Sequence, residues 1–295
     1  MNHVPWHGVV VATALPLRDD LSPDLERYAE HVRWLLDSGC DGVCPNGSLG
    51  EYQTLNDNDR AAVVRTAVEV AGPDRVLPGV SAYGSAEAAR WAQQAADAGC
   101  QAVMSLPPNT YRATEQAVVD HYRAVAAVGL PVVAYNNPFD TKIDLVPELL
   151  ARLHGEDLIK AVKEFSGDVR RGYQIAELAP GLEVVIGADD VVVELAMAGA
   201  VGWISGFPNS LPAACVALYR AAMSSNPASA LPAYRMLHPL LRWDSRTEFV
   251  QAIKLSMDVA GRYGGPCRPP REALPEEIAA QIRSDTEKVL AEGLG

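Results

Sequence analysis

The feature that most constrains the fold is a short phrase that recurs three times along the chain. Residues 38–43 read SGCDGV, residues 98–103 read AGCQAV, and residues 198–203 read AGAVGW. In each copy a stretch with helical periodicity ends at a glycine, and a short apolar run follows. Glycine suits the left-handed position that closes a helix, and a continuous apolar run suits a strand buried on both faces of a sheet. The phrase therefore indicates repeated junctions between a helix and a parallel strand.

Apolar runs between such junctions predict eight strands, and helical periodicity lies between them, as at residues 25–36, 58–71, 86–98 and 115–127. Eight strand-then-helix units within about 225 residues is the number expected of a TIM barrel. A doubly wound sheet would carry a glycine-rich turn after its first strand, where this chain has ALPL. We therefore predict an α/β fold, a TIM (β/α)8 barrel. Its strands are expected at Gly8–Ala14, Gly42–Asn46, Val76–Ser81, Ala102–Leu106, Pro131–Asn136, Leu158–Phe165, Val184–Gly187 and Val201–Ser205.

Beyond Tyr219 the pattern is purely helical, with candidate helices at residues 230–243, 248–262 and 276–291. Breaks rich in proline and glycine separate them, and no low-complexity linker precedes them. We expect residues 1–225 to form the catalytic barrel and residues 226–295 to form a C-terminal helical extension packed on it.

Charge and hydropathy exclude several classes of partner. Lys and Arg number 25 against 37 Asp and Glu, which gives a net charge of −12, the wrong sign for tracking a phosphate backbone. The longest uncharged stretch, residues 195–219, is interrupted by Gly206, Pro208 and Pro212, so we interpret it as buried core. The first residues lack the basic segment of a secretory signal. We expect neither nucleic acid nor membrane as a partner.

Cysteine and histidine usage suggests the compartment and the metal content. The five cysteines lack C-x-x-C spacing, as expected of reduced thiols in a cytoplasmic protein. The six histidines are scattered along the chain, so a metal-dependent aldolase on the same barrel lacks its ligands. We expect no metal.

Polar residues at the predicted strand ends are the candidates for chemistry, because a TIM barrel places its active site there. Alternation puts Ile159, Ala161 and Lys163 on one face of the strand. If the apolar side chains of that face point into the barrel, Lys163 points there too. A desolvated amine loses its proton and becomes the nucleophile that forms a Schiff base with a ketone. The alternative is that Lys163 is the cation of an interior ion pair.

Two further strand ends complete the predicted site. Tyr135 lies on the neighbouring strand, and by alternation its side chain points to the same face as that of Lys163. It could shuttle protons there. The alternative is a core tyrosine bonded to the backbone. Gly47, Ser48 and Leu49 offer consecutive N–H groups and a hydroxyl, which suit a carboxylate, although the loop could be a plain turn. Together they suit a 2-oxo acid held by its carboxylate while Lys163 condenses with its ketone.

At these residues the chain resembles the dihydrodipicolinate synthase/N-acetylneuraminate lyase family of Schiff-base lyases. GSLGE at 47–51 is similar to the family's carboxylate loop, YNNP at 135–138 to its Y-N-x-P strand end, and KEFSGD at 163–168 to its lysine strand. The resemblance implies an imine at Lys163, proton transfer by Tyr135, and carboxylate binding by Ser48 and the Leu49 amide. It also implies a homotetramer without metal or organic cofactor. Ser205 and Gly206 are expected near the pocket, with Tyr111 and Asp140 at its wall.

The departures from the family's pattern bear on the substrate. Lysine-pathway synthases carry a threonine where this chain has Leu49, and an arginine at the position that matches Asp140. Several motifs, including FVQAIKL at 249–255, look more like the branch that deaminates and dehydrates 1-pyrroline-4-hydroxy-2-carboxylate. The resemblance therefore favours a one-substrate lyase. A two-substrate pyruvate-dependent aldolase or 4-hydroxy-tetrahydrodipicolinate synthase is one alternative, and a catalytically silent barrel that binds a 2-oxo acid is another.

Overall fold

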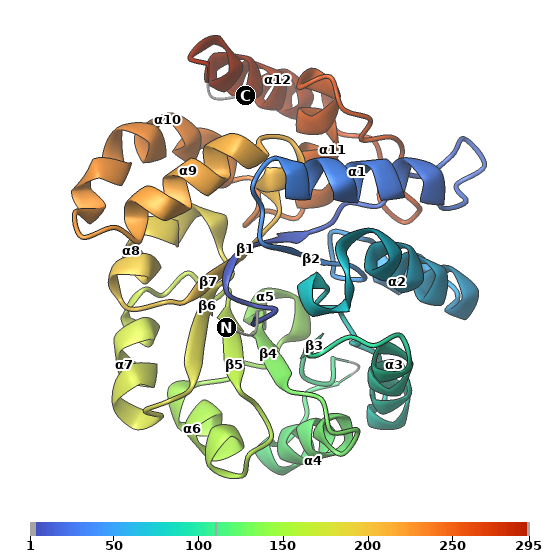
Figure 1. The fold of residues 1–295 in the computed structure, drawn as a ribbon, viewed down its shortest axis with the longest axis vertical. Coiled ribbons are helices and arrows are strands. Elements are labelled where there is room, and N and C mark those ends of the chain that lie inside the picture. Colours follow the sequence, from blue (N-terminus) through green and yellow to red (C-terminus); the bar gives the residue numbers. More distant parts are fainter. Residues whose placement is uncertain (1–3, 110, 294–295) are drawn as a thin grey trace.

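The computed structural model describes residues 4–109 and 111–293, and at its centre is a parallel sheet that curls into a barrel (Figure 1). Every hydrogen-bonded pair of strands is parallel, and the spatial order is β2-β1-β7-β6-β5-β4-β3. This arrangement confirms the predicted TIM barrel. The strands of the described residues are β1 (Gly8–Ala12), β2 (Gly42–Cys44), β3 (Val103–Ser105), β4 (Val132–Asn136), β5 (Ala161–Glu164), β6 (Glu183–Ile186) and β7 (Gly202–Ser205).

The predicted strand at Val76–Ser81 is present as isolated bridges rather than as a continuous ladder. Val76 pairs with Val43 of β2, and Gly79 pairs with Met104 of β3, both in parallel. Pro78 interrupts the segment because it has no N–H to donate, although its carbonyl still accepts from the Met104 N–H at 3.0 Å. The segment therefore closes the barrel between β2 and β3 as the eighth strand position.

Helices surround the strands, as Figure 1 shows. Asp24, Asn56 and Thr114 begin α1, α2 and α4 by accepting a backbone N–H of the first turn, which is the ordinary role of such N-cap side chains. The first two copies of the recurring phrase end α1 and α3, and the third ends α8. The helices of the barrel are α1 (Leu25–Asp37), α2 (Asp57–Ala71), α3 (Ser85–Asp97), α4 (Glu115–Ala126), α5 (Pro138–Thr141), α6 (Pro147–Gly155), α7 (Arg170–Leu178), α8 (Val192–Met197) and α9 (Pro212–Ala222).

The glycines of the recurring phrase have the conformation that the sequence predicts. Gly39, Gly99 and Gly199 have φ values of 97°, 88° and 96°, in the region that favours glycine. The helix therefore stops at each of them and the chain turns into the next strand.

The C-terminal helices lie along one side of the barrel, and the chain ends there (Figure 1). The first two are shorter than predicted, with a turn of residues 242–248 between them, and the third spans the predicted residues 276–291. α12 packs on both α10 and α11. Within residues 4–109 and 111–293, no helix is long and apolar enough to cross a membrane. The helices are α10 (Leu231–Leu241), α11 (Phe249–Val259) and α12 (Glu276–Ala291).

Candidate active site

Lys163 and Tyr135 lie side by side at the carboxyl ends of β5 and β4. The register of the two strands pairs Tyr135 with Lys163, which confirms the predicted neighbourhood of the two side chains. The Lys163 Nζ atom is 4.3 Å from the centre of the Tyr135 ring. Both residues are buried, with 6% and 5% of their surface exposed, and both line the same cavity. An amine and a phenol can therefore act on one ligand atom in this cavity.

Burial favours the neutral form of both groups. It lowers the pKa of the Lys163 amine, an effect that the nearby Asp244 carboxyl, Cys44 and Asp189 oppose. Burial also raises the pKa of the Tyr135 phenol well above its ordinary value, with Asp244 and Asp140 adding to the shift. Desolvation is the largest cause in both cases. A neutral amine is a nucleophile and a neutral phenol is a proton donor, so burial favours the protonation states that imine formation needs.

The opposite faces of β4 and β5 hold the two strand ends in place. The Asn136 amide donates to Glu164 Oε2 at 3.0 Å and accepts the Leu145 N–H at 2.9 Å. Glu164 Oε1 accepts the Ser166 N–H at 2.6 Å. Asn136 and Glu164 alternate with Tyr135 and Lys163 along their strands, so these bonds fix the strand ends without occupying the cavity.

The loop after β2 presents Gly47, Ser48 and Leu49 to the cavity. Asn46 and Glu51 flank it in the left-handed region, with φ values of 56° and 55°, a conformation that costs non-glycine residues energy. The surrounding structure must therefore hold this loop in shape.

A buried ion pair supplies part of that constraint. Glu51 Oε1 accepts from the Lys254 ammonium of α11 at 2.9 Å, and Glu51 Oε2 accepts the Arg268 N–H at 2.9 Å. Only 1% of the Glu51 and 2% of the Lys254 side chain is exposed. Lys254 also donates to the Pro266 carbonyl at 2.7 Å. The C-terminal helices are thus tied to the loop that lines the cavity.

Changing Glu51 to glutamine is expected to lower the free energy of unfolding by about 3–5 kcal/mol, because it leaves the buried Lys254 ammonium without its carboxylate. Urea unfolding measures the change. The double variant Glu51→Gln with Lys254→Met should recover most of the loss, since it removes both charges. Glu115→Gln is the matched control: it breaks an exposed pair with Arg152 and should leave stability nearly unchanged. A stability of Glu51→Gln equal to that of the wild type contradicts this account.

The end of β7 is organised around Asp189, which is fully buried. One of its oxygens accepts from Trp203 Nε1 at 2.9 Å, and the other accepts the Ser205 hydroxyl at 2.8 Å and the Gly206 and Phe207 N–H groups. Burial raises the pKa of Asp189 to about 6. Ser205 is buried and bonded to Asp189 and is not among the residues that line the cavity, whereas Gly206 lines it.

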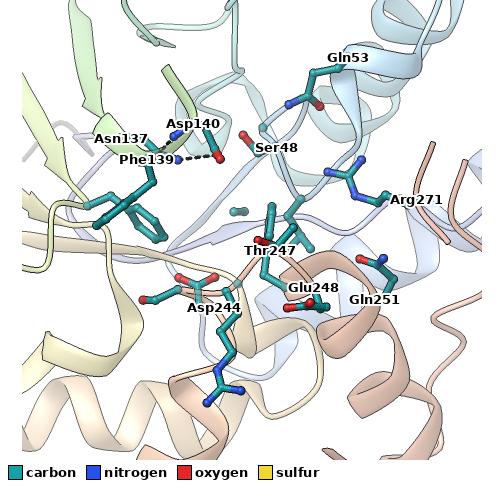
Figure 2. Close-up of a pocket in the computed structure, with 18 of the residues that line it drawn as sticks. Ser48, Gln53, Asn137, Phe139, Asp140, Asp244, Thr247, Glu248, Gln251 and Arg271 are labelled. Atoms are coloured by element: carbon teal, nitrogen blue, oxygen red, sulfur yellow. Dashed lines mark hydrogen bonds between the residues drawn. The ribbon is translucent and has the colours of Figure 1, made fainter. Parts of the chain in front are cut away.

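The two residues expected at the pocket wall are placed differently from each other. Asp140 lines the cavity, and its carboxylate accepts from the Asn137 amide at 2.8 Å (Figure 2). Tyr111 is 67% exposed and is not among the residues that line the cavity of a single chain. The expected place of Tyr111 in the pocket is therefore not found within one chain.

The cavity has a volume of about 860 Å³ and is closed on one side by the C-terminal region. The sequence motifs did not indicate this wall, because its residues lie in the turn before α11, on α11 and in the segment before α12, where no strand ends. Within the described residues, no group of three or more His, Cys, Asp or Glu side chains could hold a metal ion. The wall residues shown in Figure 2 are Asp244, Thr247, Glu248, Gln251 and Arg271.

A parallel barrel with a buried lysine and tyrosine at its carboxyl end, beside a loop of backbone N–H groups, defines the class of Schiff-base lyases. Comparison with known proteins then fixes the family. Residues 5–289 match the Dihydrodipicolinate synthetase family, so the chain belongs to that family. It is an enzyme, a lyase of the Schiff-base-forming class.

Relatives of known sequence cover nearly the whole chain. A 4-hydroxy-tetrahydrodipicolinate synthase of Methanothrix thermoacetophila is 31% identical over 281 residues, which cover 94% of this chain and 95% of that protein. An uncharacterized DapA-like lyase of Halobacterium salinarum is also 31% identical, over 95% of this chain and 92% of that protein.

Solved structures show the same architecture. The 4-hydroxy-tetrahydrodipicolinate synthase of Methylacidiphilum fumariolicum SolV has a TM-score of 0.91 at 25% identity, covering 98% of this chain and 99% of that one. YagE of E. coli K12, a prophage protein of the dihydrodipicolinic acid synthase family solved in complex with pyruvate, has a TM-score of 0.88 at 26% identity, covering 98% and 99%.

Proposed function

We propose that Lys163 forms the imine of this lyase, with C2 of a small 2-oxo acid or of its cyclic imine. The observation that carries the proposal is the buried Lys163 amine beside the Tyr135 ring, in the cavity that the loop of Ser48 lines. The Lys163 amine attacks C2, and Tyr135 moves protons to and from the reacting atoms. Ser48, with the N–H groups of Gly47 and Leu49, holds the substrate carboxylate.

The substrate that we propose is 1-pyrroline-4-hydroxy-2-carboxylate, which would make the protein a deaminase and dehydratase. Attack of the Lys163 amine on C2 forms a new C–N bond. The ring C2–N bond then breaks as Tyr135 gives its proton to the ring nitrogen, which leaves the iminium of Lys163 at C2. Removal of a C3 proton gives an enamine, and the enamine expels the 4-hydroxyl as water. The former ring nitrogen, now an amine on C5, is released as ammonia after isomerisation and hydrolysis.

The residue at position 140 of the pocket wall supports a one-substrate reaction. Asp140 lines the cavity at the position that matches the arginine with which lysine-pathway synthases bind the carboxylate of a second substrate. A carboxylate there repels a second anionic substrate. Leu49, which is apolar and buried, replaces the second hydroxyl of those synthases. Neither substitution obstructs an elimination from a single bound substrate.

The second candidate is a two-substrate aldolase or 4-hydroxy-tetrahydrodipicolinate synthase, which the names of several relatives favour. In that case pyruvate would form the imine and an aldehyde would enter from the side of Asp140.

We further propose a homotetramer that works in the cytoplasm. The free state of the cysteines among the described residues fits a reducing compartment.

Turnover of single substrates separates the two candidates. We expect the purified enzyme to consume 1-pyrroline-4-hydroxy-2-carboxylate alone and to release one ammonia per substrate, measured by a coupled ammonia assay. Pyruvate with aspartate semialdehyde should give turnover lower by about 100-fold or more, a loss of at least 2.7 kcal/mol of transition-state binding. If pyruvate is consumed only when the aldehyde is present, and the pyrroline is not consumed, the two-substrate function replaces this one.

A further inference from the structure

Asp244 is a buried carboxyl group on the cavity wall that no sequence motif indicated. It lies in the turn between α10 and α11, and Figure 2 shows it across the cavity from Ser48 and Asp140. The Asp244 carboxyl packs against Gly206 at the end of β7, where an added Cβ atom would come within 2.9 Å of Oδ1. Glycine at position 206 thus leaves the space that this carboxyl group occupies.

Asp244 faces both of the proposed reacting groups. After burial, the charge of an ionised Asp244 would be the largest influence on the pKa of the Lys163 amine and on that of the Tyr135 phenol, so the carboxyl group lies near both. Asp244 and Lys163 line the same cavity, and within the described residues no direct ion pair joins them. A substrate bound to Lys163 therefore has the Asp244 carboxyl beside it.

The two buried carboxyl groups near Lys163 differ in their partners. Asp189 accepts four hydrogen bonds, from Trp203, Ser205, Gly206 and Phe207, and these stabilise its ionised form. Asp244 accepts only the Asp189 N–H among the causes that act on its pKa by hydrogen bonding, and burial and the Asp189 charge raise that pKa well above its ordinary range, against the effect of Lys163. The hydrogen bonds of Asp189 therefore favour the negative charge there, and burial favours a proton on Asp244, whose carboxyl group lines the cavity.

We propose that Asp244 is a catalytic acid that protonates the hydroxyl leaving from C4 of the substrate. The inference rests on the proposed imine at Lys163 and on carboxylate binding by the loop of Ser48. The loop of Ser48 then holds the carboxylate and Lys163 holds C2. C3 and C4 extend into the rest of the cavity, which Asp244 lines.

The step balances with the groups present. Tyr135, whose proton has passed to the ring nitrogen as that nitrogen left C2, accepts the C3 proton as the enamine forms. The enamine electrons then make the C3–C4 double bond and regenerate the C2 iminium, while the C4–O bond breaks. The proton of Asp244 converts the leaving hydroxide to water, and solvent later returns a proton to the Asp244 carboxylate. Carbon–carbon cleavage needs the opposite, a base that takes the proton of the C4 hydroxyl, so a protonated Asp244 directs this site toward dehydration.

The test compares two reactions of the variant Asp244→Asn, which keeps the shape of the side chain but has no proton to transfer. The first is exchange of the methyl hydrogens of pyruvate with D₂O, followed by NMR, which needs the imine and proton transfer at C3 but no leaving group. The second is ammonia release from 1-pyrroline-4-hydroxy-2-carboxylate. Asp120→Asn, an exposed carboxylate on α4, is the matched control and should change neither reaction.

We expect Asp244→Asn to exchange pyruvate hydrogens within about threefold of the wild-type rate and to lose at least about 100-fold in ammonia release. Ammonia release within about fivefold of wild type overturns the proposal. Equal loss of both reactions also overturns it, because Asp244 would then act through Lys163. The wild type serves as the separate test of the underlying function: a wild type that exchanges no pyruvate hydrogens and releases no ammonia refutes the proposed lyase site itself.

Discussion

Replacing Lys163 by alanine is expected to lower kcat/KM by on the order of 10⁴-fold or more, because the nucleophile of the imine step is removed. The variant should fold, since the amine is buried in the barrel and its removal relieves a desolvation cost. Ammonia release from the pyrroline substrate measures the loss, and circular dichroism verifies the fold.

Lys160→Ala is the matched control for this variant. Lys160 lies three residues earlier in the chain, is exposed, and pairs with Asp157 at the surface. Its loss should leave kcat/KM within about twofold of wild type, as for surface substitutions away from special features. If Lys163→Ala retained a tenth of the wild-type activity, Lys163 would be a structural cation and the proposed mechanism would be wrong.

Changing Tyr135 to phenylalanine is expected to lower kcat by about 10²–10³-fold, the usual contribution of a positioned acid or base. The ring and its contact with Lys163 remain, so KM for the substrate should change little. Borohydride trapping of pyruvate on the variant should still give an adduct, only more slowly. The split between kcat and KM distinguishes a proton shuttle from a packing role.

Tyr122→Phe is the control for loss of a buried phenol. The Tyr122 hydroxyl donates to the Ser105 carbonyl at 3.0 Å and bonds the Tyr135 backbone, but Tyr122 does not line the cavity. This variant should cost about 1 kcal/mol of stability and lower kcat by no more than about threefold, since the Tyr135 hydroxyl remains. Equal kcat values for Tyr135→Phe and Tyr122→Phe would show that the Tyr135 hydroxyl takes no part in proton transfer.

The sequence predicted the barrel and the centre of the site because both follow from local rules. Gly39, Gly99 and Gly199 mark where helices end, and apolar runs after them mark strands. Strand parity and the spacing of neighbouring parallel strands then bring Tyr135 to Lys163, as the observed register shows. Where the sequence shows a proline inside an apolar run, as at Pro78, the ladder breaks although the chain still closes the barrel.

The cavity wall could not be predicted in the same way. Asp244 belongs to a turn between two helices, and only the packing of the C-terminal helices against the barrel brings it to the end of β7. The orientation of Ser205 toward Asp189 depends on a contact between β7 and the segment after β6. The placement of Asp244 and the orientation of Ser205 each depend on contacts between residues that are distant in the sequence. Residue type and local spacing therefore do not predict them.

The most direct test of the central claim is reduction of the wild-type enzyme by sodium borohydride in the presence of pyruvate, followed by peptide mapping. A mass increase confined to the peptide that contains Lys163 is the expected result, because borohydride converts a Schiff base into a stable secondary amine. Lys163→Ala should show no adduct under the same conditions. An adduct on another lysine, or none with pyruvate and longer 2-oxo acids, would contradict the assignment of Lys163 as the imine-forming residue.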